Sequence, residues 1–196
     1  RFDAACVRDP HPMNPGLFLR HALQRPSTAG AILPSSPMLA RAMTRQADHA
    51  SLLVELGAGT GAVTRELRET HAHTPLIAIE AQPDMAAHLR EAFPEVDVRT
   101  QWAHEVLDEL CDRAPLRTVL VSSLPFRSLP SDVRDVTIAS VCRFLNADPS
   151  RRLVQYTYQP RAPFDLPTGP IAGRLSWTRM STVWRNAPPA GVWVLQ

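Results

Sequence analysis

Lysine is absent from the chain, and cysteine and tyrosine are scarce, with three and two residues among 196. The three cysteines show no C-x-x-C spacing, which argues against a disulfide framework or a zinc site and favours a reducing cytoplasm. No run of about 18 consecutive apolar residues occurs, so the sequence predicts no membrane-spanning helix. The seven histidines show no metal-ligand spacing, and no metal is expected.

The charge of the chain is nearly balanced. All 21 cationic residues are arginine, and 19 acidic residues leave a net charge of +2. This balance is not typical of a nucleic-acid-binding protein, so no nucleic-acid partner is expected. Arginine binds phosphate through two parallel N–H bonds, which becomes relevant if the substrate carries a phosphate.

The N-terminal part is predicted to be an extension of the main domain. Arg1–Pro12 is polar and interrupted by prolines, unlike a signal peptide, and the absence of a starting methionine suggests a processed chain. We expect a helical extension over residues 1–49, facing the membrane or forming a lid, and one main domain over residues 50–196. In the extension, Leu17–Arg25 predicts a short helix that suits either an anionic membrane surface or the cap of a core. Ser36 and Pro37 predict the start of a helix that reaches about His49.

Short apolar runs alternate with helical stretches over the main domain. Strands are predicted at Leu52–Leu56, Leu76–Glu80, Val96–Thr100, Thr118–Ser123 and Leu153–Tyr158. Helices are predicted at Thr60–His71, Pro83–Phe93, Ala103–Arg113 and Pro130–Asn146. Because the strands are apolar on both sides, the pattern predicts an α/β, Rossmann-like fold with a mostly parallel sheet between helices.

The C-terminal part departs from this alternation. Gln159–Leu175 is a long loop rich in proline and glycine, and loops of this length are usually lids or binding loops. Three of its apolar residues are expected to be exposed, where they can enter a bilayer: Phe164, Leu166 and Ile171. Ser176–Arg185 and Gly191–Leu195 then predict a hairpin, which makes seven strands with an antiparallel last strand.

A glycine-rich loop, Val54–Ala62, joins the first strand to a helix. Glycine lets the backbone turn sharply and approach a ligand, and the helix that follows offers unpaired N–H groups. Gly57-x-Gly59-x-x-Ala62 fits the dinucleotide fingerprint, so a nicotinamide dehydrogenase is one alternative.

Three features favour S-adenosylmethionine over a dinucleotide. Glu55 stands two residues before the first glycine, where a carboxylate can meet the ammonium group of a methionine moiety. The glycines run G-x-G-x-G with Thr60 between the last two, and the terminal hairpin is the arrangement found in methyltransferases. Glu80, at the end of the second strand, is expected to accept hydrogen bonds from both ribose hydroxyls, a role common to both cofactors.

Five segments together resemble the bacterial phospholipid N-methyltransferases. They are Leu17–Met43, Val54–Thr64, Val121–Phe126, Gln155–Pro160 and Val183–Ala190. That family is similar in its core to rRNA adenine dimethylases and converts phosphatidylethanolamine stepwise to phosphatidylcholine; near relatives methylate ornithine lipids. The resemblance implies a cytoplasmic enzyme, peripherally associated with the inner membrane, that binds a phospholipid substrate and releases S-adenosylhomocysteine.

The resemblance also implies roles for individual residues. The cofactor is expected to contact Ser35, Ser36, Glu55, Gly57, Ala58, Gly59, Thr60, Gly61, Glu80, Ala81, Gln101, Trp102, Ala103 and Ser122. Gln101 and Trp102 stand where related enzymes carry a Gly-Asp pair whose aspartate binds the adenine amino group.

The amine is expected to lie at the end of the fourth strand. Ser123 and the Leu124 carbonyl are expected to hold it, and Pro125 and Phe126 to border it, with the Phe126 ring facing a cation. Tyr156 and Tyr158 are predicted to lie on one face of their strand beside the amine, and Arg185 to hold the lipid phosphate.

Three alternatives remain open at the level of function. One is an ornithine-lipid N-methyltransferase. Another is an rRNA or tRNA adenine N-methyltransferase, which predicts a basic RNA surface. The last is a protein that binds S-adenosylmethionine and senses lipid composition without turnover.

Overall fold

A computed structural model describes residues 36–196. The sequence-based predictions for Leu17–Arg25 and Ser35 lie outside the described residues. The division of the chain near residue 49 stays a prediction.

The first described helix, α2 (Pro37–Thr44), begins as predicted. Ser36 is its N-cap, and the Ser36 hydroxyl accepts a hydrogen bond from the Leu39 amide at 3.2 Å. Pro37 follows at the first helical position, where its missing N–H costs nothing. A short 3₁₀ turn, η1 (Arg45–Ala47), extends the helix almost to the predicted end.

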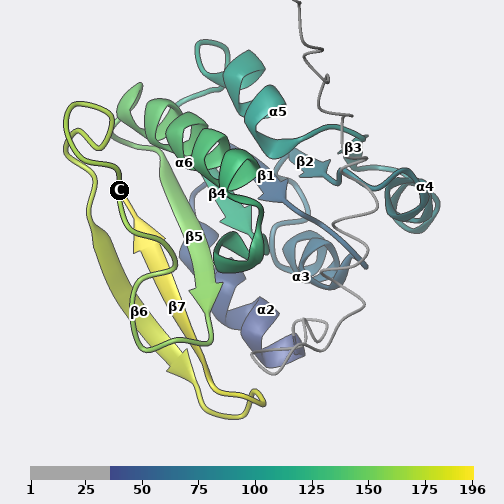
Figure 1. Cartoon of the computed structure of the whole chain (residues 1–196). Coiled ribbons are helices and arrows are strands. Elements are labelled where there is room, and N and C mark those ends of the chain that lie inside the picture. The colour runs from purple at the N-terminus through teal and green to yellow at the C-terminus, as the bar shows by residue number, and fades with distance from the viewer. Residues whose placement is uncertain (1–35) are drawn as a thin grey trace, which may run out of the picture.

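Seven strands form one sheet in the order β3-β2-β1-β4-β5-β7-β6 (Figure 1). The strands are β1 (Leu52–Leu56), β2 (Leu76–Ile79), β3 (Asp97–Arg99), β4 (Thr118–Ser122), β5 (Arg152–Thr157), β6 (Trp177–Val183) and β7 (Ala190–Leu195). β1 to β5 pair in parallel, and β7 pairs antiparallel with both β5 and β6. The predicted sheet is confirmed, with the refinement that the antiparallel strand lies inside the sheet and β6 forms the edge.

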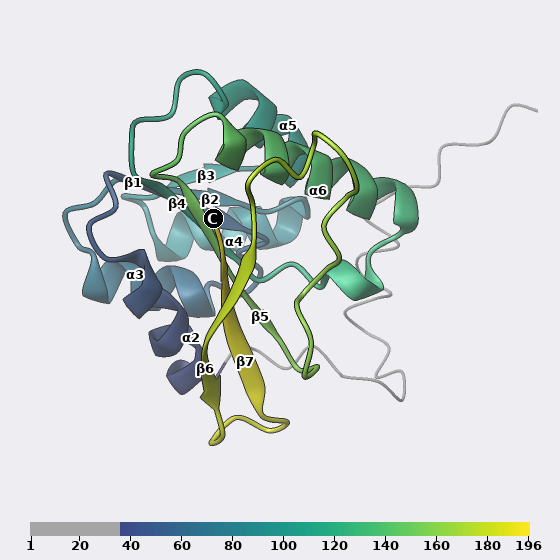
Figure 2. The ribbon, with the colours of Figure 1, turned by 90° about the vertical axis from the view of Figure 1, so that its left-hand side faces the viewer.

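The helices cover both faces of the sheet (Figure 2). They are α3 (Ala62–Thr70), α4 (Pro83–Ala92), α5 (Ala103–Leu110) and α6 (Ser131–Asn146), with a 3₁₀ turn η2 (Phe126–Ser128) after β4. One apolar cluster joins α2, α3 and α4 to one face, and a second joins α5 and α6 to the other. Successive residues of β1 alternate between the clusters, so Glu55 points toward α3 while Val54 points toward α6.

The long loop after β5 is not exposed in the way the sequence predicts. Phe164 is 3% exposed, and its ring packs against Phe126 at 4.6 Å and Trp177 at 4.9 Å between centroids. Leu166 also packs on the α5–α6 cluster, and only Ile171 is well exposed. The prediction that all three apolar residues are exposed is therefore wrong, because aromatic neighbours distant in sequence cover Phe164.

Candidate functional site

The glycine loop is fastened to the end of the neighbouring strand. The amides of Gly57 and Ala58 both donate to the Ile79 carbonyl, at 2.9 and 3.0 Å. Gly57 has a φ of +74°, and a Cβ built there would lie 2.6 Å from Cδ2 of Leu124. Glycine is therefore required at this position by both the backbone and the space around it.

Glu80 holds the loop in shape from the end of β2. Its carboxylate accepts hydrogen bonds from the amides of Gly59 at 2.8 Å and Gln82 at 2.9 Å. The side chain is nearly buried, and burial raises its pKa above the ordinary value. The Ala81 amide is a third backbone donor to this carboxylate, so about one of its roughly four acceptor positions remains for a ligand.

Glu55 is fully buried beneath the same loop. Its Oε2 atom accepts a hydrogen bond from the Thr64 hydroxyl at 2.7 Å, whereas its Oε1 atom has no partner among the described residues. Burial raises the pKa of Glu55 to about 7, and the hydrogen bond from Thr64 opposes this only in part. A cation bound nearby would lower the pKa of Glu55 and favour its ionised form, and the unpaired Oε1 atom would then pair with that cation.

A small cavity of about 30 Å³ lies between the loop and the ends of the central strands. Six of the predicted cofactor residues line it: Gly57, Glu80, Ala81, Gln101, Trp102 and Ala103. Leu124 closes it on the side of β4. The structure thus brings together residues that are up to 46 positions apart in sequence, from Gly57 to Ala103.

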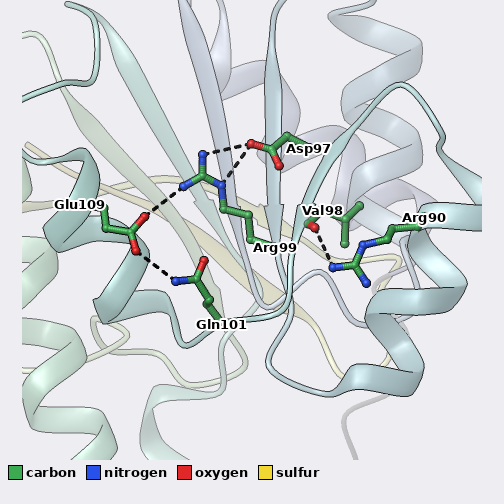
Figure 3. A network of polar contacts seen from close by, with 6 residues as sticks. All are labelled: Arg90, Asp97, Val98, Arg99, Gln101 and Glu109. Atoms are coloured by element: carbon green, nitrogen blue, oxygen red, sulfur yellow. Dashed lines mark hydrogen bonds and ion pairs between the residues drawn. The ribbon is translucent and has the colours of Figure 1, made fainter.

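The side chain of Gln101 is engaged outside this cavity (Figure 3). Its amide donates to Glu109 of α5 at 3.1 Å, and Arg99 joins Glu109 to Asp97. The Trp102 amide donates to Glu105 at 2.9 Å and so starts α5. A side-chain hydrogen bond from Gln101 to adenine would require Gln101 to leave Glu109.

A larger cavity of about 310 Å³ opens on the other side of Leu124. Five residues predicted to hold or border the amine line it: Leu124, Pro125, Phe126, Tyr156 and Tyr158. The two tyrosine rings meet edge to face, with centroids 5.5 Å apart, and Phe126 is only 2% exposed because Phe164 covers it.

Some predicted residues do not line either cavity. Ser123 donates its amide to the Leu56 carbonyl at 3.0 Å, and the buried Ser122 hydroxyl accepts from the Leu124 amide at 3.2 Å. These bonds shape the turn after β4 and so position Leu124. Arg185 is exposed on the turn between β6 and β7. Ser36 acts as the N-cap of α2.

Sequence reasoning missed seven residues that line the larger cavity: Arg127, Ser128, Gln155, Thr157, Gln159, Pro163 and Pro188. Gln155 is 2% exposed and donates its amide to the carbonyls of Leu124 at 3.2 Å and Tyr156 at 3.0 Å. Arg127 donates to the Ala162 carbonyl at 2.7 Å. A polar residue inside an apolar strand was the available signal for Gln155.

The described residues, 36–196, hold no group of three or more metal-ligating side chains. Within that range no helix combines the length and apolar character needed to cross a bilayer.

Comparison with known proteins shows sequence similarity to a lipid-modifying enzyme. An ornithine lipid N-methyltransferase of Singulisphaera acidiphila is 34% identical over 131 residues, covering 60% of this chain and 65% of that protein. A methyltransferase-like protein of Schizosaccharomyces pombe, itself uncharacterized, is 42% identical over 52 residues, covering 26% of this chain and 20% of that protein. The chain therefore spans less than two thirds of either relative. No protein-family model matches it.

Solved structures with a similar fold are methyltransferases. The magnesium protoporphyrin IX methyltransferase of Synechocystis PCC 6803, solved with bound S-adenosylmethionine, has a TM-score of 0.54 at 11% identity, with 99% of both chains covered. A precorrin-6y C5,15-methyltransferase of Geobacter metallireducens has a TM-score of 0.55 at 15% identity, with 87% of this chain and 92% of that chain covered. The chain therefore has the Rossmann-like fold of class I methyltransferases, as the sequence predicts.

Proposed function

We propose that the protein is an S-adenosylmethionine-dependent N-methyltransferase that methylates the amine of a membrane lipid. The observation that carries the proposal is that Leu124 lines both cavities. A donor bound on the Gly57 side and an amine bound on the Tyr158 side would therefore meet at Leu124, where the methyl group can reach the nitrogen directly. Catalysis of methyl transfer depends mainly on aligning the two reactants and excluding water.

The residues around the small cavity fit the proposed donor. Glu80 keeps an acceptor position for a ribose hydroxyl, and the unpaired Oε1 atom of Glu55 suits an ammonium group. No atom lies within 4 Å of the position that a Cβ would take at Gly59, so the loop backbone leaves space there. S-adenosylmethionine, when bound, supplies a methyl group that is already activated on a sulfonium sulfur.

The larger cavity fits an aliphatic amine. The rings of Tyr156 and Tyr158 provide faces for a nitrogen that becomes cationic. The Leu124 carbonyl already accepts hydrogen bonds from the Phe126 amide and the Gln155 side chain, at 3.0 and 3.2 Å. Transfer forms a nitrogen–carbon bond and breaks the carbon–sulfur bond, with the electron pair left on sulfur and one amine proton passed to water. The chain needs only to hold the amine in line and keep bulk water away.

The lipid class is supported by the relative from Singulisphaera acidiphila, which is named as an ornithine lipid N-methyltransferase. Phosphatidylethanolamine is the substrate that the resemblance to bacterial phospholipid N-methyltransferases implies. Both lipids present a primary amine on an anionic or zwitterionic headgroup, so both are candidates for the same cavity.

The turn between β6 and β7 supports contact with a membrane. β6 runs in the same direction as β5, so Trp184 and Arg185 follow it at the edge where the parallel strands end (Figure 1). Trp184 is 77% exposed, Pro188 of the same turn lines the larger cavity, and no acidic residue follows Asp165 in the sequence. An exposed indole beside arginine suits an anionic lipid surface, and we propose peripheral association with the cytoplasmic membrane.

Trp184→Ala should weaken binding to phosphatidylglycerol-rich vesicles about tenfold, because an indole inserted among headgroups loses its apolar contact. Met180→Ala is the matched control, since Met180 is 48% exposed in β6 but away from the turn. Sedimentation with vesicles measures the effect. An equal loss in both variants would contradict the assigned membrane contact.

Incubation of the protein with labelled S-adenosylmethionine and vesicles tests the function directly. Vesicles that contain phosphatidylethanolamine or ornithine lipid should become labelled, and the comparison of the two decides which headgroup is preferred. Donor binding by calorimetry without transfer to either lipid would favour the lipid-sensing alternative, and salt-dependent RNA binding would favour the adenine methyltransferase.

A further inference from the structure

Gln155 is a buried amide in the wall of the larger cavity, on the strand next to the turn that carries Leu124. It pairs across the sheet with Ser122 on one side and Trp193 on the other. The two residues that precede it in β5, Leu153 and Val154, are apolar and fully buried. An uncharged polar side chain in this position is costly unless its hydrogen bonds are made.

Only half of this amide is satisfied. Its nitrogen donates to the carbonyls of Leu124 and Tyr156, at 3.2 and 3.0 Å, and these two acceptors fix which end of the amide is the nitrogen. Its oxygen, Oε1, is buried and accepts no hydrogen bond from any described residue. Leaving a buried carbonyl oxygen without a partner is costly, and an apolar residue would fill this position without that cost.

We propose that Gln155 is an amine-binding residue, and that its Oε1 atom accepts a hydrogen bond from the substrate amine. This inference rests on the proposed function. As the amine enters, the amide turns slightly toward the cavity, since its oxygen is fully covered in this structure. The Leu124 carbonyl already accepts from the Phe126 amide and from Gln155, so Oε1 of Gln155 is the acceptor left for the amine.

A neutral primary amine has two N–H groups, and either can donate to Oε1 of Gln155. A monomethylated amine has one N–H group to offer, and a neutral dimethylated amine has none. The contribution of Gln155 should therefore decrease as the lipid amine is methylated.

The test uses Gln155→Met, which keeps the length and volume of the side chain and removes its polar atoms. Vesicles carry phosphatidylethanolamine, its monomethyl form or its dimethyl form, or the corresponding ornithine lipids if the wild-type protein prefers them. We expect kcat/KM to fall about tenfold on the primary amine and less than twofold on the dimethylated amine. Donor affinity, measured by calorimetry, should stay within twofold of wild type.

Gln159→Met is the matched control. Gln159 lines the same cavity, but its oxygen already accepts a hydrogen bond from Arg161 at 3.0 Å. This variant should not discriminate between the three lipids. If Gln155→Met does not fold, Gln155→Asn withdraws the oxygen by one methylene, and the same ratio of losses is measured.

The outcomes separate the inference from the function on which it rests. Equal losses on all three lipids would show a structural role only and would overturn the inference, as would full activity on the primary amine. Wild-type protein that methylates none of the lipids would overturn the proposed function, and the role of Gln155 with it.

Discussion

The two cavities on either side of Leu124 are built in different ways. The small cavity is bordered by the Gly57 backbone, by the Glu80 carboxyl group and by mostly apolar side chains, and the buried Glu55 lies close to Glu80. The larger cavity is bordered by aromatic rings, prolines, two amides and Arg127, with no carboxylate among its lining residues. The first offers carboxyl groups to a ligand that carries hydroxyl and ammonium groups, whereas the second offers aromatic and amide groups to a ligand that enters from outside.

Gly57→Ala should disturb both cavities and have the largest effect. The new Cβ would lie 2.6 Å from the Leu124 side chain at a φ of +74°, so Leu124 must move. We expect methyl transfer to fall about a hundredfold, since small displacements at a reacting centre have effects of this size. Activity with the labelled donor measures the loss.

Gly169→Ala is the control for this substitution. Gly169 has a similar φ of +82°, and no atom lies within 4 Å of its would-be Cβ. It therefore carries the backbone strain without the collision. Comparable activity in the two variants would show that the position of the Leu124 side chain does not matter for methyl transfer.

Tyr158→Ala should affect only the larger cavity. Loss of the ring removes one face for the amine, and we expect KM for the lipid to rise about tenfold while donor affinity is unchanged. Tyr158→Phe keeps the ring and should remain close to wild type. A change in donor affinity in either variant would contradict the separation of the two sites.

A substitution of Glu55 should affect only the small cavity. Its main effect should be on how the free energy of unfolding and the donor affinity depend on pH. The pKa of Glu55 in the folded protein, about 7, lies above the ordinary value of 4.5, so the folded state holds the proton more tightly than the unfolded state does. The free energy of unfolding is therefore expected to be highest below pH 4.5 as far as this group is concerned, and to decrease between about pH 4.5 and 7.

Urea unfolding of wild type and Glu55→Gln across this range measures the effect. The variant should lose the slope that Glu55 contributes. Donor affinity of the wild type should rise severalfold between pH 6 and 7.5, as the carboxylate becomes available to the ammonium group. An affinity that falls over this interval would contradict the role of Glu55.

The sequence predicted the small cavity well because each of its parts carries its own local signal. The glycines follow β1 directly, and Glu80 ends the next strand along the chain, so periodicity and spacing locate both. All five parallel strands and the terminal hairpin were predicted to within about two residues at each end for the same reason.

The larger cavity could not be predicted to the same degree, since its contacts join residues that are far apart in sequence. Gln155 meets Leu124 across 31 positions, and Arg127 meets Ala162 across 35. Phe164 was expected to be exposed because nothing near it in sequence covers it, yet Phe126 and Trp177 do. These contacts depend on the pairing of β4 with β5 and on how the loop after β5 packs against η2 and β6, and no local pattern encodes that arrangement.

The direction of β7 has a practical consequence. The strand starts at Ala190, beside the turn that borders the larger cavity, and runs away from it, so Gln196 lies at the opposite edge of the sheet, where its backbone bonds with Ser176. A surface tether or fluorescent reporter attached after Gln196 would therefore sit on the far side of the molecule. In a protein immobilised in this way, the turn between β6 and β7, which we propose to face the membrane, would point toward the solution. Binding of intact vesicles to it could then be measured in a flow cell.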